Sequence, residues 1–119
     1  MARILIVDDE SEILELIESE VKSLGHEVVT TNSPMHALQL LKDHLNLFDL
    51  VLCDVVMPGK NGIDFVREVN RIPWFEGRIA LMSSYTDALA QEFKDVGVTD
   101  VLRKPFDVQK LMSFFSEVC

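Results

Sequence analysis

Four short apolar runs in the sequence each end in polar residues of a kind that can do chemistry. Carboxylates follow the first two runs, hydroxyl groups follow the third, and an ammonium group follows the fourth. In chain order these residues are Asp8, Asp9 and Glu10, then Asp54, then Ser83 and Ser84, and then Lys104 with Pro105. A carboxylate beside buried residues is costly unless it is paired, bound to a metal or used in a reaction. One such end is easily a solvated loop, whereas four together indicate a site.

The residue types narrow the chemistry of such a site. Carboxylates held close together repel one another, so they take up protons more readily or recruit a cation. Oxygen ligands with room for water suit Mg²⁺ better than zinc. A hydroxyl and a lysine that face a metal-bound carboxylate can hold the equatorial oxygens of a transferring phosphoryl group. A carboxylate that attacks phosphorus forms an acyl phosphate, so these residues are typical of phosphoryl transfer.

Two alternating periodicities predict the elements that must position these side chains. Apolar runs predict buried strands at residues 4–7, 28–31, 50–53, 79–82 and 98–102. Apolar residues spaced three and four apart predict helices within residues 13–24, 35–45, 63–69, 89–96 and 108–115. Ser33 before Pro34 and Asp107 are expected N-caps, and Gly25 and Gly97 are expected to end helices. This alternation predicts an α/β fold, with ligands bound beyond the carboxyl ends of parallel strands.

Length and composition bound the class of protein. The 119 residues predict one domain over residues 1–119, and 48% hydrophobic with 26% charged residues is ordinary for a globular chain. No apolar run approaches the roughly 18 residues of a membrane span, so we expect a cytoplasmic protein without a membrane partner. The net charge of −9 argues against direct nucleic acid binding, because phosphate contacts need clustered Lys and Arg. Cys53 and Cys119 form no metal or redox motif.

Four segments together resemble the receiver domain of the two-component response regulators, of the chemotaxis-regulator type. These segments are ILIVDDE at 4–10, LVLCDVVMPGKNG at 50–62, IALMSSY at 79–85 and VLRKPFD at 101–107. In this order and at these spacings they form a specific signature that extends over essentially the whole chain. The resemblance implies a flavodoxin-like (βα)5 three-layer sandwich whose five-stranded parallel sheet has the order 2-1-3-4-5.

The resemblance also implies roles for the acidic residues. Asp54 resembles the phosphoacceptor, and it resembles a direct Mg²⁺ ligand together with Asp9. Asp8 resembles the acid that acts mainly through a metal-bound water. The third protein ligand of the ion would be the main-chain carbonyl of Val56, which any residue type can supply.

Three further positions match the family, and one departs from it. Ser83 matches the hydroxyl and Lys104 the lysine that engage the phosphoryl group, while Lys104–Pro105 matches a peptide bond that is cis in the family. Val101 stands where the family usually has a Tyr or Phe ring that moves when the phosphoryl group binds. The expected route from the site to the output surface is therefore in question, and Tyr85 is the candidate substitute for the moving ring.

The function implied by the resemblance is a signalling switch rather than an enzyme. A histidine kinase or histidine phosphotransfer protein would supply the phosphoryl group, and a downstream protein or tethered output domain would respond. One alternative is a degenerate receiver that works without phosphorylation, although the acid, hydroxyl and lysine set is complete. An aspartyl-phosphate phosphatase would show DxDx[TV] after an early strand, and a flavin-binding domain would lack the acids of DDESE, which repel a phosphate.

Aromatic residues outside these motifs favour structural roles. Trp74 and Phe75 are expected to cover the edge of the core, with a surface for a partner as the alternative. Phe114 and Phe115 are adjacent on the last predicted helix, and helical spacing favours burial of one ring over the other.

Overall fold

The computed structural model describes residues 1–43, 45, 47–57, 59–84 and 88–119. Strands and helices alternate five times in this part of the chain, as the periodicity predicted. They are β1 (Arg3–Val7), α1 (Ser11–Ser23), β2 (Glu27–Thr31), α2 (Pro34–Lys42), β3 (Leu50–Asp54), α3 (Gly62–Val69), β4 (Arg78–Ser83), α4 (Ala90–Asp95), β5 (Asp100–Arg103) and α5 (Val108–Val118). No helix among these described residues is long and apolar enough to cross a membrane.

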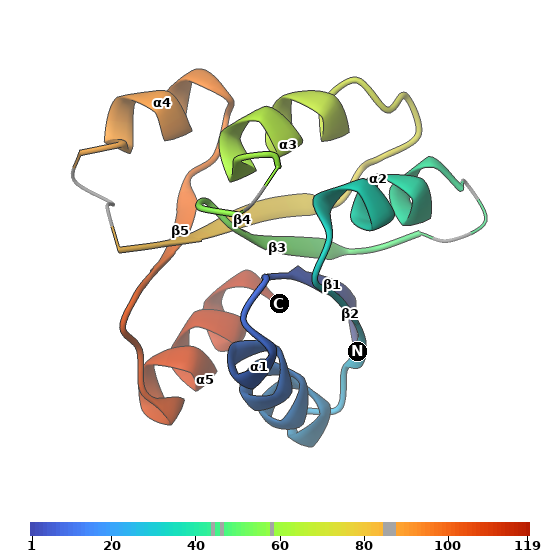
Figure 1. The fold of residues 1–119 in the computed structure, drawn as a ribbon. Helices are drawn as coiled ribbons and strands as arrows, with labels where there is room; N and C mark the ends of the chain where they lie inside the picture. The colour runs from blue at the N-terminus through green and yellow to red at the C-terminus, as the bar shows by residue number, and fades with distance from the viewer. Residues whose placement is uncertain (44, 46, 58, 85–87) are drawn as a thin grey trace.

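The strands form one parallel sheet in the order β2-β1-β3-β4-β5. This order and the flavodoxin-like class are therefore confirmed. Helices α1 and α5 cover one face of the sheet, and α2, α3 and α4 cover the other (Figure 1). The register pairs Val7 with Cys53, Asp54 with Met82 and Ser83 with Arg103, so the carboxyl ends of the four strands β1, β3, β4 and β5 meet at one edge.

Burial on both faces explains the continuous apolar runs in the strands. Along β1, Leu5 and Val7 enter one hydrophobic cluster, while Ile4 and Ile6 enter the cluster on the opposite face. All five residues of β3 are buried, including the terminal Asp54. Fully burying one such aliphatic side chain stabilises a fold by about 1.5–3 kcal/mol, so these two layers hold the strand ends in fixed positions.

Capping residues determine where several helices begin and end. The side chains of Ser33, Asn61 and Asp107 accept hydrogen bonds from first-turn backbone N–H groups of α2, α3 and α5. Gly25 and Gly97 follow α1 and α4 with φ of 89° and 81°, a conformation that favours glycine. The predicted caps at Ser33 and Asp107 are thus confirmed.

Three local predictions are wrong in detail. The helix predicted to reach Leu45 ends at Lys42, and Leu45 is 84% exposed. The last strand begins at Asp100 rather than Val98, which is buried in the preceding loop. Phe114 and Phe115 are both buried in the core on the α1 and α5 face, and their rings meet edge to face at 84° with centroids 5.4 Å apart.

Candidate functional site

The polar residues at the strand ends converge at the carboxyl edge of the sheet. Asp8 follows β1 directly, Asp54 and Ser83 are the last residues of β3 and β4, and Lys104 follows β5. Asp8, Asp54 and Ser83 are only 0%, 5% and 2% exposed. The backbone N–H of Lys104 donates to the Ser83 carbonyl at 3.0 Å, which holds these two strand ends together. The sheet therefore positions the acids, the hydroxyl and the lysine that the sequence indicated.

Lys104 is the cation at the centre of this group. Its Nζ lies 2.9 Å from Oδ2 of Asp8, 3.4 Å from Oδ2 of Asp54 and 3.6 Å from Oε1 of Glu10. The other oxygen of Asp8, Oδ1, accepts the backbone N–H of Glu10 at 2.9 Å. The peptide bond between Lys104 and Pro105 is cis. One ammonium group is thus shared by three carboxylates, so the network keeps an excess of negative charge.

The acids also form a set of oxygen donors that fits a divalent cation. One carboxylate oxygen from each of four residues lies within 4.8 Å of the others; the residues are Asp8, Asp9, Glu10 and Asp54. Asp9 is exposed and lines a pocket of about 310 Å³ together with Asp54, Val56, Ser83 and Lys104. Hard oxygen donors beside an open, water-accessible space are what Mg²⁺ prefers, because it keeps several of its waters. The residues present therefore fit this ion.

Burial and neighbouring charges shift the pKa values of Asp54 and Lys104. Burial, and then the negative charge of Asp8, raise the pKa of Asp54 from 3.8 to about 6, although Lys104 and a hydrogen bond from the Val56 backbone oppose the rise. Burial lowers the pKa of Lys104, but the hydrogen bond and charge of Asp8 and the charges of Asp54 and Glu10 outweigh it. The net pKa of Lys104 is raised, so it stays an ammonium group.

The raised pKa of Asp54 means that its ionisation destabilises the fold. Well below pH 3.8 the carboxyl is protonated in both the folded and the unfolded chain, so it does not change the free energy of unfolding. As the pH rises from 3.8 to about 6 the unfolded chain loses the proton first, and the penalty is complete above that range. Asp54→Asn is therefore expected to raise the free energy of unfolding at pH 7 by about 2 kcal/mol in EDTA, and to change it little near pH 4.

Urea unfolding followed by circular dichroism at the two pH values measures this difference. An asparagine variant that is less stable than the parent at pH 7 would contradict the electrostatic account. Added Mg²⁺ should reduce the difference in the free energy of unfolding between the variant and the parent at pH 7, because a ligand that binds the folded parent stabilises it.

The structure describes one of the two residues expected in the switch region, Val101, but not the other, Tyr85. Val101 is half-buried on β5, where it pairs with Leu81 and packs against the core on the α2, α3 and α4 face. Tyr85 lies outside the described residues. Glu10 is a contact of Lys104 to which sequence reasoning gave no role, although its place directly after Asp8 and Asp9 is the signal that could have found it.

Comparison with known proteins assigns the chain to a family. Residues 4–116 match the response regulator receiver domain. The chain belongs to this family. Receiver domains are signalling phosphoacceptors rather than classical enzymes, and they generally bind Mg²⁺ at an acidic pocket. Membership of this family argues against the two alternatives of another class, an aspartyl-phosphate phosphatase and a flavin-binding domain.

Relatives of this receiver domain include curated proteins and solved structures. It is 31% identical over 117 residues to the response regulator SaeR of Staphylococcus aureus, an alignment that covers 94% of this chain and 48% of the relative. The chain thus spans about half the length of the curated relatives it matches. The chemotaxis response regulator CheY4 of Vibrio cholerae superimposes with a TM-score of 0.92 at 30% identity, over 100% of this chain and 99% of that one. A response regulator structure from Chloroflexus aurantiacus has a TM-score of 0.86 at 28% identity, over 98% and 96%.

Proposed function

We propose that this receiver domain accepts a phosphoryl group on Asp54 from a histidine kinase or a histidine phosphotransfer protein. The observation that carries the proposal is the position of the Lys104 ammonium group, which lies 2.9 Å from Asp8 and 3.4 Å from Asp54. It lines the same pocket as the buried Ser83 hydroxyl. A nucleophile, a hydroxyl donor and a cation in one pocket are the groups that phosphoryl transfer needs.

In the proposed reaction, a carboxylate oxygen of Asp54 attacks phosphorus and forms an acyl phosphate. The bond between phosphorus and the donor nitrogen breaks, and that nitrogen keeps the electron pair and takes up a proton. Ser83 donates its hydroxyl hydrogen to one phosphoryl oxygen, and Lys104 pairs with another. Lys104 therefore exchanges its Asp54 contact for a phosphoryl contact while Asp8 continues to hold it.

The acid cluster would hold Mg²⁺ during this reaction. We propose Asp9, Asp54 and the Val56 main-chain carbonyl as direct ligands, and Asp8 as the acid that acts through a bound water. When bound, the ion neutralises charge on the transferring phosphoryl group. Asp9 is exposed toward the pocket, as is Glu10, whereas Asp8 is fully buried and tied to Lys104, which supports a direct role for Asp9 and an indirect one for Asp8.

Phosphoryl uptake from a small donor tests the proposal without a cognate kinase. Incubation of the chain with phosphoramidate and Mg²⁺ is expected to add one phosphoryl group, measured by intact-protein mass spectrometry. Hydroxylamine should remove the group, because it cleaves an acyl phosphate but not a phosphoserine ester. EDTA should suppress the uptake. A chain that stays unmodified under all these conditions would favour the alternative, a degenerate receiver that works as a phosphorylation-independent interaction module.

The proposed ligand roles lead to a second expected result. Asp9→Ala should weaken Mg²⁺ binding by more than about tenfold, since a direct ligand is lost, whereas Asp8→Ala should weaken it less. Isothermal titration calorimetry with MgCl₂ measures both constants. Asp64→Ala, which removes an exposed acid of α3 paired with Arg67, is the matched control and should bind like the parent. Parent-like binding by the Asp9 variant would contradict the geometry.

We further propose how the domain is used. Residues 1–119 form one receiver domain that acts in the cytoplasm and switches a protein-binding surface, read by a separate protein or a tethered output domain. Because Val101 carries no ring, the change at Asp54 must reach that surface without an aromatic side chain at this position. The charge of −9 supports protein partners over nucleic acid.

A further inference from the structure

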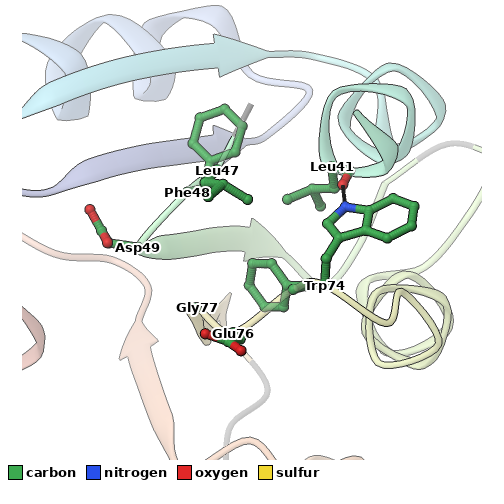
Figure 2. Close-up of a pocket in the computed structure, with 8 residues that line it drawn as sticks. Leu41, Leu47, Phe48, Asp49, Trp74, Glu76 and Gly77 are labelled. Carbon is green, nitrogen blue, oxygen red and sulfur yellow. Dashed lines mark hydrogen bonds between the residues drawn. The ribbon is translucent and has the colours of Figure 1, made fainter. Parts of the chain in front are cut away.

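A second pocket, of about 270 Å³, lies at the end of the sheet opposite Asp54 (Figure 2). It is formed where the chain leaves α2 and enters β3, and where it enters β4 from the loop after α3. We call it the Trp74 pocket and define it by the residues that line it, which are Leu41, Leu47, Phe48, Asp49, Trp74, Phe75, Glu76 and Gly77. The proposed phosphorylation chemistry uses none of these residues.

Apolar side chains form the inner surface of the Trp74 pocket. Leu41 and Phe48 are 2% and 5% exposed, whereas Leu47 and Trp74 at the rim are 60% and 39% exposed. The indole Nε1–H of Trp74 donates to the Leu41 carbonyl at 3.0 Å, which fixes the ring against the last turn of α2. A large rigid ring with exposed aliphatic surface beside it is typical of a binding surface.

Close packing of backbone and rings sets the shape of the pocket. A Cβ at Gly77 would lie 2.5 Å from the Phe48 carbonyl oxygen and 2.8 Å from the Phe75 ring, so glycine is required for this close approach. The Arg3 guanidinium lies 4.6 Å from the centroid of the Phe48 ring and holds that ring in place. The pocket is therefore preformed, which lowers the cost of binding.

Charge at the rim is acidic. Asp49 and Glu76 are the charged residues among those that line the pocket, and Figure 2 shows them away from the Trp74 indole. The Asp49 carboxylate is fixed by the backbone N–H of Arg3 at 2.8 Å. Two cations lie nearby. The Arg3 guanidinium contacts the Phe48 ring and the Leu47 carbonyl and pairs with Glu27 at 3.7 Å, and the Arg78 side chain pairs with Asp100 at 2.9 Å. Each cation thus has an acidic partner outside the pocket, and the two charges of the lining residues themselves are negative.

We propose that the Trp74 pocket binds a basic, apolar segment of a partner protein. A leucine-like or aromatic side chain enters beside Trp74, and a neighbouring Lys or Arg pairs with Glu76 and Asp49. A second copy of this chain would place acidic rim against acidic rim, and the net charge of −9 adds to that repulsion. Anionic lipid and nucleic acid are disfavoured for the same reason. The opposite end of the sheet stays free for phosphoryl transfer.

Trp74 is the single tryptophan of the chain, so its emission reports on the pocket directly. The probes are three end-capped tetrapeptides: arginyl-leucyl-leucyl-arginine, the same peptide with glutamates for the arginines, and the same peptide with serines for the leucines. The first is expected to change Trp74 emission saturably at millimolar concentration and to shift the amide NMR signals of Leu47 and Glu76. The other two should bind more weakly.

Variants test each part of the recognition. Asp49→Asn with Glu76→Gln should weaken the basic peptide about three- to tenfold, since each exposed ion pair contributes up to about 1 kcal/mol. Leu47→Ser, at an exposed position that the fold does not need, should weaken it as well. Glu92→Gln on α4, which does not line the pocket, is the matched control and should bind like the parent.

Three results would overturn the proposal. The acidic peptide binding as tightly as the basic one would remove the role of the rim. No saturable change in emission or amide shifts with the basic peptide would show that the pocket does not take this class of ligand. Sedimentation velocity that finds a dimer of the parent, lost in Leu47→Ser, would assign the surface to a second copy instead.

Discussion

Asp54→Asn is expected to abolish phosphoryl uptake from phosphoramidate while leaving the fold intact. The amide of asparagine is a much poorer nucleophile than a carboxylate toward phosphorus, and it also removes one charge from the acid cluster. Among the acids of the cluster, Asp54 stands at the end of β3, where it faces Lys104 and lines the pocket that also holds Ser83. The loss should be complete within the detection limit of mass spectrometry.

A matched exchange separates this effect from a general change of charge. Asp64→Asn removes one negative charge from an exposed position on α3, and it should be phosphorylated like the parent. Asp54→Asn should also keep the circular dichroism spectrum of the parent. Stoichiometric, hydroxylamine-sensitive modification of the Asp54 variant would show that another carboxylate is the acceptor.

Gly62→Ala is expected to have a large effect on stability. An alanine Cβ at this position would lie 2.6 Å from the Asp54 carbonyl oxygen and 2.8 Å from the Val55 Cα. The neighbours are backbone atoms that cannot rotate aside, and the Gly62 N–H donates to the Val55 carbonyl at 2.7 Å, so α3 cannot retreat without losing this bond. We expect the free energy of unfolding to fall by about 3 kcal/mol.

A second glycine provides the comparison. Gly97 has φ of 81°, and a Cβ added there would meet no atom within 4 Å, so Gly97→Ala meets conformational strain but no clash. It should cost about 1–2 kcal/mol and leave the rate of phosphoryl uptake unchanged. Gly62→Ala should slow the uptake as well, because the clash displaces Asp54. Urea unfolding and the phosphoramidate assay measure both, and equal stability of the Gly62 variant and the parent would refute the steric argument.

The alternation of strands and helices predicted a parallel α/β sheet and the gathering of the site for a physical reason, whereas the strand order came from the resemblance to receiver domains. Parallel strands share one direction, so whatever follows each apolar run arrives at the same edge of the sheet. Asp8, Asp54, Ser83 and Lys104 are all placed by this rule. This rule does not predict side-chain directions. The contacts of Lys104 with Asp8 and Glu10 depend on the conformation of the long, flexible lysine side chain, which the spacing of residues does not determine.

The predictions for single residues were wrong where local periodicity does not determine helix ends or burial. Leu45 continues a helical apolar spacing but lies beyond the C-cap of α2, so it is exposed. Phe114 and Phe115 point in different directions around α5, and both are still buried. For the region of the Trp74 pocket, the sequence predicted only that Trp74 and Phe75 cover the core edge or face a partner. The pocket itself combines the last turn of α2 with the segments before β3 and β4, which local pattern does not bring together.

The two thiols of the chain differ in their accessibility to reagents. Cys53, directly before Asp54, is fully buried and its Sγ donates to the Asp54 carbonyl at 3.2 Å, whereas Cys119 is exposed. Burial, with the charges of Asp54 and Asp8, raises the pKa of Cys53 well above its usual value, which leaves almost no reactive thiolate. The pKa of Cys119 is raised as well, by partial burial and the charge of Asp49, so accessibility is what separates the two thiols. A maleimide dye should mark Cys119 in the native protein, and Cys53 only when β3 opens. The rate at which Cys53 is labelled therefore measures how often the strand that ends at Asp54 opens.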